Sequence, residues 1–325
     1  MKKKFLVTGG AGFIGSHLVE ALLAAGHGVV VLDDLSTGKR ANLPREVAFH
    51  HASITDPQAV RAALAGADGC FHLAAIASVA RASKEWFTTH QTNLGGLIVL
   101  FEAVRAMPAP IPVVYASSAA VYGDRAALPI VEDAAKHPLS AYGADKLGCE
   151  SHAGVASHVH GIPTMGLRFF NVYGPRQDPG SPYSGVISIF CERILGGTPV
   201  AIFGDGGQTR DFIFVADVVA ALTAAMTHLM AGSRKDAPVK DAPVFNVCTG
   251  KATSVRDLAA IIAELCGRAP DLRFAPARKG EIRHSCGAPE AGRAALGLTA
   301  PVPLKQGLAS VLAWLDQASV GASSA

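Results

Sequence analysis

A short apolar strand that runs into a glycine turn and then a helix constrains this chain more than any other feature. The apolar run at residues 5–7 predicts a buried parallel strand, and the sequence GGAGFIG follows it almost directly. Apolar residues then recur at helical spacing until Gly26 ends the pattern. Gly9 permits a tight turn, Gly12 lets backbone N–H groups approach a pyrophosphate, and Gly15 lets the helix pack closely on the strand. The segment therefore predicts a dinucleotide bound at a helix N-terminus.

A second apolar strand, at residues 29–32, ends at Asp33. Asp33 follows Gly15 at close to the separation, about 20 residues, at which an acidic side chain receives the adenosine ribose. A carboxylate at this point hydrogen-bonds the ribose 2′-hydroxyl and repels a 2′-phosphate, which favours NAD over NADP. Two alternatives stay open, because Lys39 and Arg40 lie nearby and could hold a phosphate, and because Asp33 could simply open a loop.

Length and charge limit the class of protein. A chain of 325 residues suits a nucleotide-binding domain with a smaller partner domain. The net charge is only +3 and no long cationic block is present, so neither nucleic acid nor a membrane surface is expected as a partner. The lysines at residues 2–4 precede too short an apolar run for a secretion signal, and no apolar stretch approaches the ~18 residues of a membrane span. The six cysteines form no CxxC pair and the histidines show no metal-ligand spacing, so we expect a cytoplasmic protein with reduced thiols and no metal.

Strands and helices alternate along the first half of the chain. Further strands are expected near residues 47–50, 69–73 and 113–116, with helices from Pro57 and through residues 93–106. This order predicts an α/β fold, namely a Rossmann-type doubly wound parallel sheet with helices on both faces. Ligands should bind at the carboxyl ends of its strands.

The composition of the sequence changes after Asn171, where loops rich in glycine and proline begin. We therefore expect an NAD-binding domain at residues 1–170 and a smaller α/β substrate-binding domain at residues 171–325. Segments at about 211–250 are expected to return to the first domain. Ser254 and Asp257 predict a capping box that opens an amphipathic helix in the second domain.

Tyr142 and Lys146 place a phenol and an ammonium four residues apart, on the same face of a helix. A phenol is a poor base at neutral pH, and a nearby ammonium favours its ionised form. Such a pair is common on ordinary amphipathic helices. Here it follows a glycine dinucleotide turn and a strand that ends at residues 117–118 with two serines, which indicates a catalytic role.

Most of the chain from residue 4 to residue 285 carries a set of longer motifs: TGGAGFIG, LDDLSTG, FHLAAIASV, YASSAAVYGD, YGADK, LRFFNVYGPRQDP, SPYSGVI, FGDGGQTRDFIFVADV and RKGEIRHS. In these motifs the chain resembles the extended short-chain dehydrogenase/reductase family and, within it, the nucleotide-sugar 4-epimerases. The glycine turn and the YxxxK pair separately define only the superfamily, whereas the whole set is specific.

The resemblance implies a mechanism. Tyr142 would take the proton from the sugar 4-hydroxyl while the C4 hydride passes to tightly held NAD. Ser118 would hydrogen-bond the reacting oxygen, and Lys146 would hold the nicotinamide ribose. The 4-keto intermediate would then turn over and receive the hydride on its other face, so that NAD is regenerated.

The resemblance also implies two sets of binding residues. The cofactor set comprises Gly9, Gly12, Phe13, Ile14, Gly15, Asp33, Ser53, Ile54, Leu73, Ala74, Ala75, Asn93, Tyr142 and Lys146. The substrate set comprises Ser118, Asn171, Val186, Ile202, Phe203, Arg210, Arg278, Glu281 and Ser285. In that set the arginines would contact the diphosphate, Glu281 the nucleotide ribose, and the backbone near residues 202–203 the uracil. For Arg210 an ion pair with Asp205 or Asp211 is the structural alternative.

Three departures from the family pattern matter. Ser53 stands where many relatives have an aspartate that reads adenine, so it would bond adenine more weakly. Ala119 and Ala120 replace the acid pair of the sugar-nucleotide 4,6-dehydratases, which disfavours dehydration. Ser285 stands where a tyrosine confines related epimerases to plain hexoses, so a bulkier substituent at the sugar C2 would fit.

The leading interpretation is therefore an NAD-dependent 4-epimerase of UDP-GlcNAc and UDP-GalNAc that serves surface-polysaccharide synthesis. UDP-glucose/UDP-galactose epimerisation and UDP-glucuronate epimerisation or decarboxylation stay open, because the small Ser285 allows a bulky substituent at the sugar C2 but does not require one. A non-catalytic NAD-binding sensor is the alternative from another class. The resemblance also implies a homodimer that pairs the helices at residues 93–106 and 142–159.

Overall fold

The centre of the protein is a parallel sheet of seven strands in the order β10-β6-β5-β4-β1-β2-β3. The computed structural model describes residues 1–178, 185–232, 242–277 and 282–322. The strands of the sheet are β1 (Lys4–Thr8), β2 (Gly28–Asp33), β3 (Ala48–His51), β4 (Gly69–His72), β5 (Val113–Ser118), β6 (Thr164–Phe169) and β10 (Val244–Val247).

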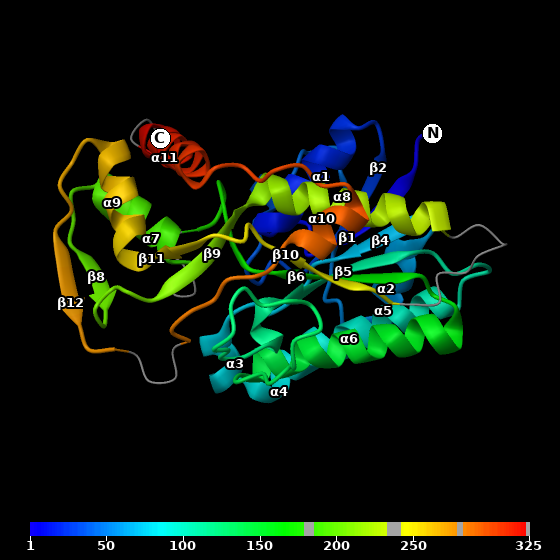
Figure 1. The fold of residues 1–325 in the computed structure, drawn as a ribbon. Helices are drawn as coiled ribbons and strands as arrows, with labels where there is room; N and C mark the ends of the chain where they lie inside the picture. Colours follow the sequence, from blue (N-terminus) through cyan, green and yellow to red (C-terminus); the bar gives the residue numbers. More distant parts are fainter. Residues whose placement is uncertain (179–184, 233–241, 278–281, 323–325) are drawn as a thin grey trace.

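Helices cover both faces of this sheet (Figure 1). One face carries α1 (Phe13–Ala24) and α8 (Val215–Gly232), and the other carries α2 (Pro57–Leu64), α5 (Gly96–Arg105) and α6 (Ala141–His160). Val7 packs in the first core and Leu6 in the second. Because the central strands β1 and β2 are buried on both sides, they appear in the sequence as continuous apolar runs. The predicted α/β fold is confirmed.

Side-chain caps fix where several helices begin. Asp56 accepts hydrogen bonds from two backbone N–H groups at the start of α2, and Pro57 occupies its first turn. Ser140 caps α6, and Gly161 ends that helix in the left-handed conformation. Ser254 caps α9 (Val255–Cys266) through the N–H of Asp257, as the capping box predicts.

The helix expected at residues 93–106 is longer and less regular than predicted. It starts as α4 (Trp86–His90), passes through a π-helical turn at Gln91–Gly95 and continues as α5. A short helix, α3 (Val79–Lys84), precedes it. Local widening of this kind re-aims side chains without breaking the helix. The buried side chain that the turn re-aims is Asn93.

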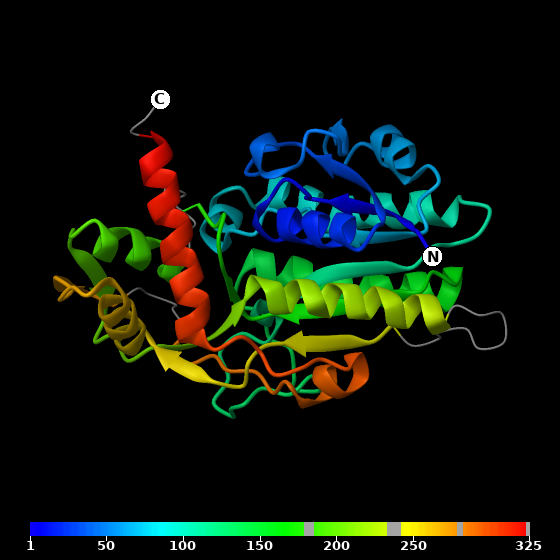
Figure 2. The ribbon, with the colours of Figure 1, turned by 90° about the horizontal axis from the view of Figure 1, so that it is seen from above.

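A smaller part of the molecule lies beside the carboxyl ends of the sheet strands (Figures 1 and 2). It contains a three-stranded sheet of β11, β9 and β7 and a two-stranded sheet of β12 and β8. Its strands are β7 (Asn171–Tyr173), β8 (Val200–Phe203), β9 (Thr209–Phe214), β11 (Ala252–Ser254) and β12 (Leu272–Ala275). Its helices are α7 (Val186–Leu195), α9 and α11 (Leu304–Ala322), which surround a separate apolar core.

Two later segments lie with the large sheet. Strand β10 pairs with β6, and α8 packs on α1. Helix α10 (Glu290–Leu296) packs against β10 and α8. The division into domains at residue 170 stays a prediction. Among the described helices, α8 is the one that is long and apolar enough to cross a membrane. The core helix of a soluble protein can have the same length and composition, and 44% of α8 is buried in this structure.

Candidate active site

The glycine turn has no room for side chains. Gly9 has a φ of +70°, and a Cβ there would lie 2.7 Å from the backbone N of Ala74. A Cβ on Gly15 would lie 2.2 Å from the carbonyl oxygen of Gly9. Gly12 occupies the N-cap of α1, where no side chain caps the helix. The first N–H groups of α1 therefore stay available to an anionic ligand.

A cavity of about 340 Å³ opens in front of this turn. Most of the predicted cofactor residues line it: Gly9, Gly12, Phe13, Ile14, Gly15, Asp33, Ile54, Leu73, Ala74, Ala75, Tyr142 and Lys146. The walls are mainly apolar, while the helix end, the carboxylates of Asp33 and Asp34 and a few hydroxyl side chains supply polar groups. This combination fits a dinucleotide, because the pyrophosphate needs N–H donors and the rings need apolar walls.

Asp33 is held in place by the backbone. Its Oδ2 accepts from the N–H of Ala11 at 2.9 Å and its Oδ1 from the N–H of Leu35 at 2.8 Å. Burial raises the pKa of this carboxyl, and the two N–H donors counteract the rise. Each oxygen keeps a lone pair with which a ribose hydroxyl could be bound.

The two cations that could have held a 2′-phosphate have other partners. Lys39 forms an ion pair with Asp178 at 2.7 Å. Arg40 donates to the backbone carbonyls of Leu43, Pro44 and Arg45. These contacts agree with the preference for NAD over NADP.

The three predicted catalytic residues all line this cavity. Ser118 ends β5, while Tyr142 and Lys146 lie in the first two turns of α6. Lys146 is only 2% exposed and donates to the carbonyl oxygen of Ala116 at 2.8 Å. Its Nζ also lies 5.9 Å from the centre of the Tyr142 ring. The arrangement can hold a phenol, a hydroxyl and an ammonium around one reacting oxygen.

Two predicted cofactor residues are not part of the cavity wall. The hydroxyl of Ser53 bonds to that of Thr55 at 2.8 Å. The amide of Asn93 accepts from the N–H of Ile76 at 2.8 Å and donates to the carbonyl of the same residue at 3.2 Å. Asn93 therefore supports the loop after β4, whose residues line the cavity, and its own contact with the cofactor stays a prediction.

The predicted substrate residues are spread over the smaller part of the molecule. Asn171 starts β7, Val186 starts α7, and Ile202 and Phe203 lie on β8. Ile202 is 1% exposed in an apolar core, so its backbone is the part that a ligand could contact. Arg278 and Glu281 lie outside the described residues. All of these assignments stay predictions.

Arg210 and Ser285 lie on neighbouring segments. The N–H of Ser285 donates to the carbonyl of Thr209, the residue before Arg210, at 3.1 Å. Arg210 donates to that same carbonyl at 2.8 Å. Asp205 instead pairs with Arg283, and the carboxylate of Asp211 accepts from Thr249, Gly250 and Gly287. Asp205 and Asp211 therefore bind partners other than Arg210, with which an ion pair was the structural alternative.

Several residues that line the cavity were not among the predicted binding residues. They comprise Leu32, Asp34, Ser36, Thr37, Ala52, Ile76, Ala77, Thr92, Ala116, Ser117, Phe169, Phe170 and Val172. Most of them directly follow the carboxyl end of a sheet strand or complete it. That position is the signal that could have identified them.

Comparisons with known proteins agree with this geometry. A model of the NAD dependent epimerase/dehydratase family matches residues 5–248. A UDP-glucose 4-epimerase of Mycolicibacterium smegmatis is 38% identical over 94% of this chain and 96% of its own length. The structure of UDP-glucose 4-epimerase from Thermotoga maritima with UDP-glucose superposes with a TM-score of 0.90 at 36% identity, covering 97% and 99% of the two chains.

A second solved structure carries a different substrate name. UDP-N-acetylglucosamine 4-epimerase from Methanobrevibacter ruminantium, in complex with UDP-N-acetylmuramic acid, superposes with a TM-score of 0.89 at 32% identity. The alignment covers 98% of this chain and all of that one. The predicted family and cofactor are confirmed. The chain belongs to the NAD-dependent epimerase/dehydratase family, among its UDP-sugar 4-epimerases, and is an isomerase that works with NAD.

Proposed function

We propose that this enzyme interconverts UDP-GlcNAc and UDP-GalNAc by inverting the configuration at C4. The observation that carries the proposal is the small side chain of Ser285, which is half-buried and anchored by its backbone beside Arg210. A small residue here leaves space for an N-acetyl group at the sugar C2. The name of the Methanobrevibacter neighbour supports the same substrate class.

In the proposed mechanism bound NAD would supply the reversible hydride acceptor that inversion at the sugar C4 requires. Tyr142 takes the proton of the 4-hydroxyl, and Ser118 holds the same oxygen by a hydrogen bond. Lys146 places a buried ammonium beside the Tyr142 ring. The glycine turn holds the pyrophosphate, and Asp33 holds the adenosine ribose.

The substrate assay separates the sugars directly. The purified enzyme is incubated with UDP-GlcNAc, UDP-glucose and UDP-glucuronate in separate reactions, and the products are resolved by chromatography. Ser285→Tyr should lose activity on UDP-GlcNAc and keep it on UDP-glucose, whereas Ser285→Ala, the control that stays small, should keep both. Equal loss on both sugars in Ser285→Tyr would contradict the proposal.

Epimerisation of UDP-glucose is the second candidate, because the relatives from Mycolicibacterium and Thermotoga carry that name. UDP-glucuronate stays in the assay since UDP-glucuronic acid 4-epimerase from Bacillus cereus, a structural neighbour, is 29% identical. A sensor that binds NAD without turnover would convert none of the three.

We also propose a cytoplasmic homodimer that serves polysaccharide synthesis. The dimer would pair the helices at residues 93–106 and 142–159, and α6 exposes the apolar side chains of Val155 and Val159 there. Light scattering on the purified enzyme tests this directly. A monomer would refute it, and Val159→Asp should weaken a dimer that forms through this face.

A further inference from the structure

Three polar residues form a row across three neighbouring strands behind the catalytic residues. Ser117 of β5 is the register partner of Arg168 of β6, and Arg168 is the register partner of Asn246 of β10. Register partners present their side chains on the same face of a sheet. All three are buried, with Arg168 only 4% exposed. A charged side chain in such a place needs a partner.

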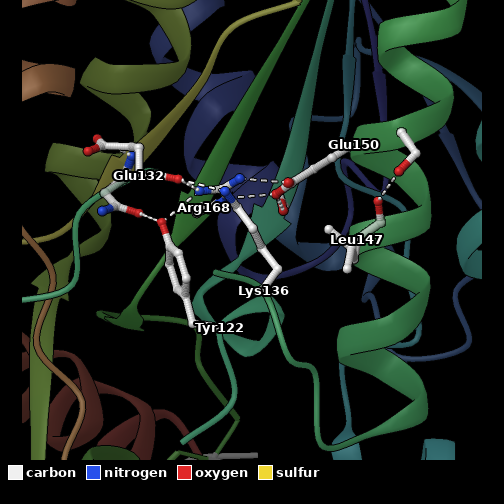
Figure 3. Close-up of polar contacts among 9 residues, drawn as sticks. Tyr122, Glu132, Lys136, Leu147, Glu150 and Arg168 are labelled. Atoms are coloured by element: carbon white, nitrogen blue, oxygen red, sulfur yellow. Dashed lines mark hydrogen bonds and ion pairs between the residues drawn. The ribbon is translucent and has the colours of Figure 1, made fainter. Parts of the chain in front are cut away.

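Helix α6 supplies that partner (Figure 3). Arg168 donates through Nε and Nη2 to the two carboxylate oxygens of Glu150, at 2.8 and 2.7 Å. The side chains of this pair are 4% and 8% exposed. The hydroxyl of Ser117 also donates to Glu150, at 2.5 Å. The bidentate geometry fixes the helix relative to both strands.

The other end of the guanidinium is bound just as completely (Figure 3). Its Nη1 donates to the hydroxyl of Tyr122 at 2.7 Å and to the carbonyl of Glu132 at 2.8 Å. Tyr122 in turn donates to the side-chain oxygen of Asn246 at 2.7 Å. Burial raises the pKa of Tyr122 to about 12, so it stays a neutral donor. Arg168 is thus fixed by groups from three separate segments, which contain Tyr122, Glu132 and Glu150.

The spacing on α6 links this cluster to the reaction. Tyr142, Lys146 and Glu150 follow one another at intervals of four residues, so they lie along one face of the helix. Lys146 donates to the carbonyl of residue 116, and Glu150 accepts from Ser117. Two successive residues of β5 are therefore tied to the catalytic helix immediately before Ser118.

Stability alone does not explain a buried ion pair. Taking both charges out of water costs most of what their attraction returns, and apolar residues of similar volume often serve the fold as well. The pair instead fixes the position of α6 relative to β5. It sets the rotation of α6 against the end of β5, and so the separation of Tyr142 and Ser118.

We propose that Glu150 and Arg168 are positioning residues for the epimerase reaction, acting through Ser117 and α6 to hold Ser118 and Tyr142 around one oxygen atom. The proposal rests on the proposed roles of Ser118, Tyr142 and Lys146 but not on the identity of the sugar. Neither residue touches substrate or cofactor, so both act through others.

The test compares steady-state kinetics of the NAD-loaded enzyme on whichever UDP-sugar it converts. Glu150→Gln keeps the shape of the side chain but places an amide against a guanidinium, and kcat should fall about 10- to 100-fold with KM little changed. In Arg168→Lys, which keeps the charge but loses the bidentate guanidinium geometry, kcat should fall less. Ser117→Ala leaves the ion pair intact and should lower kcat about tenfold. Val104→Ala, a fully buried site on α5, is the control for general destabilisation and should keep its kcat.

A purely structural role predicts a different pattern. The variants would then lose thermal stability as Val104→Ala does, while kcat per NAD-loaded site stayed at the wild-type value, and that result would overturn the proposal. Crystal structures of the wild type and Glu150→Gln with NAD give a readout that needs no sugar. We expect the Tyr142 hydroxyl and Ser118 Oγ to move apart by about 1 Å; an unchanged separation would also overturn it. Failure of the proposed function is seen separately, as full activity in Tyr142→Phe or no conversion by the wild type.

Discussion

His72 gives a sharp prediction because it is a histidine buried directly under the cofactor cavity. It ends β4, just before the loop residues that line the cavity, and is 2% exposed. Its Nδ1 lies 2.9 Å from the hydroxyl of Thr8, and its Nε2 has no hydrogen-bond partner among the described residues. Burial and, to a smaller extent, the positive charge of Lys146 lower the pKa of His72 to about 3. The ring is therefore neutral in the folded enzyme.

The sign and size of the effect follow from proton linkage. In the unfolded chain His72 has its ordinary pKa of 6.5, so it takes up a proton as the pH falls below that value, whereas the folded form does not until about pH 3. The stabilisation is complete above pH 6.5 and is lost as the pH falls from there to about 3. Between pH 7 and pH 5 the loss is about 2 kcal/mol, since each pH unit below the unfolded pKa of 6.5 costs about 1.4 kcal/mol and little is lost above it.

Urea unfolding at pH 7 and pH 5 measures this loss. His72→Asn keeps a group that can bond Thr8 but cannot take up the proton, so the wild type should lose about 2 kcal/mol more than the variant over this interval. His228→Asn, on the exposed side of α8, is the matched control and should behave as the wild type. Equal pH dependence in the wild type and His72→Asn would refute the reasoning. Because His72 supports the cavity, we also expect NAD to dissociate faster at pH 5 than at pH 7.

Three further changes test the site and the fold. Gly15→Ala should give a protein that purifies without NAD, seen by absorbance, because its Cβ would lie 2.2 Å from the carbonyl of Gly9; retention of NAD would show that the turn can open. Asp33→Asn can accept only one of the two backbone hydrogen bonds and should lose about 1–3 kcal/mol in thermal unfolding, along with NAD affinity by calorimetry. Ser254→Ala removes the cap that accepts from Asp257 and should cost about 1 kcal/mol in urea unfolding with no change in kcat.

Local sequence signals were enough to predict the parallel sheet and the glycine turn. The glycine turn, the apolar runs of β1 and β2 and the carboxylate of Asp33 all act over short distances along the chain. The pair of Tyr142 and Lys146 also lies within one helical turn, so its shared face could be derived from spacing alone.

Features that depend on register could not be derived in this way. Arg168 lies in the middle of a fully buried strand, which signals that a partner must exist, but only the pairing of β5, β6 and β10 shows which groups surround it. The role of Asn93 at the cofactor stays a prediction, but its contact with Ile76 from within a π-helical turn was not foreseen. Neither the turn nor the tertiary contact leaves a mark on the local sequence.

The row across the sheet has a consequence for exchanging parts between relatives. Asn246 comes from the chain after its excursion through the smaller part of the molecule, yet its backbone N–H donates to Glu132 and its side chain receives Tyr122. A chimera whose crossover lies between residues 168 and 246 would inherit the two ends of this row from different parents. Substrate halves from other epimerases should therefore be grafted with the strand at residues 244–247 kept from the parent that supplies Arg168.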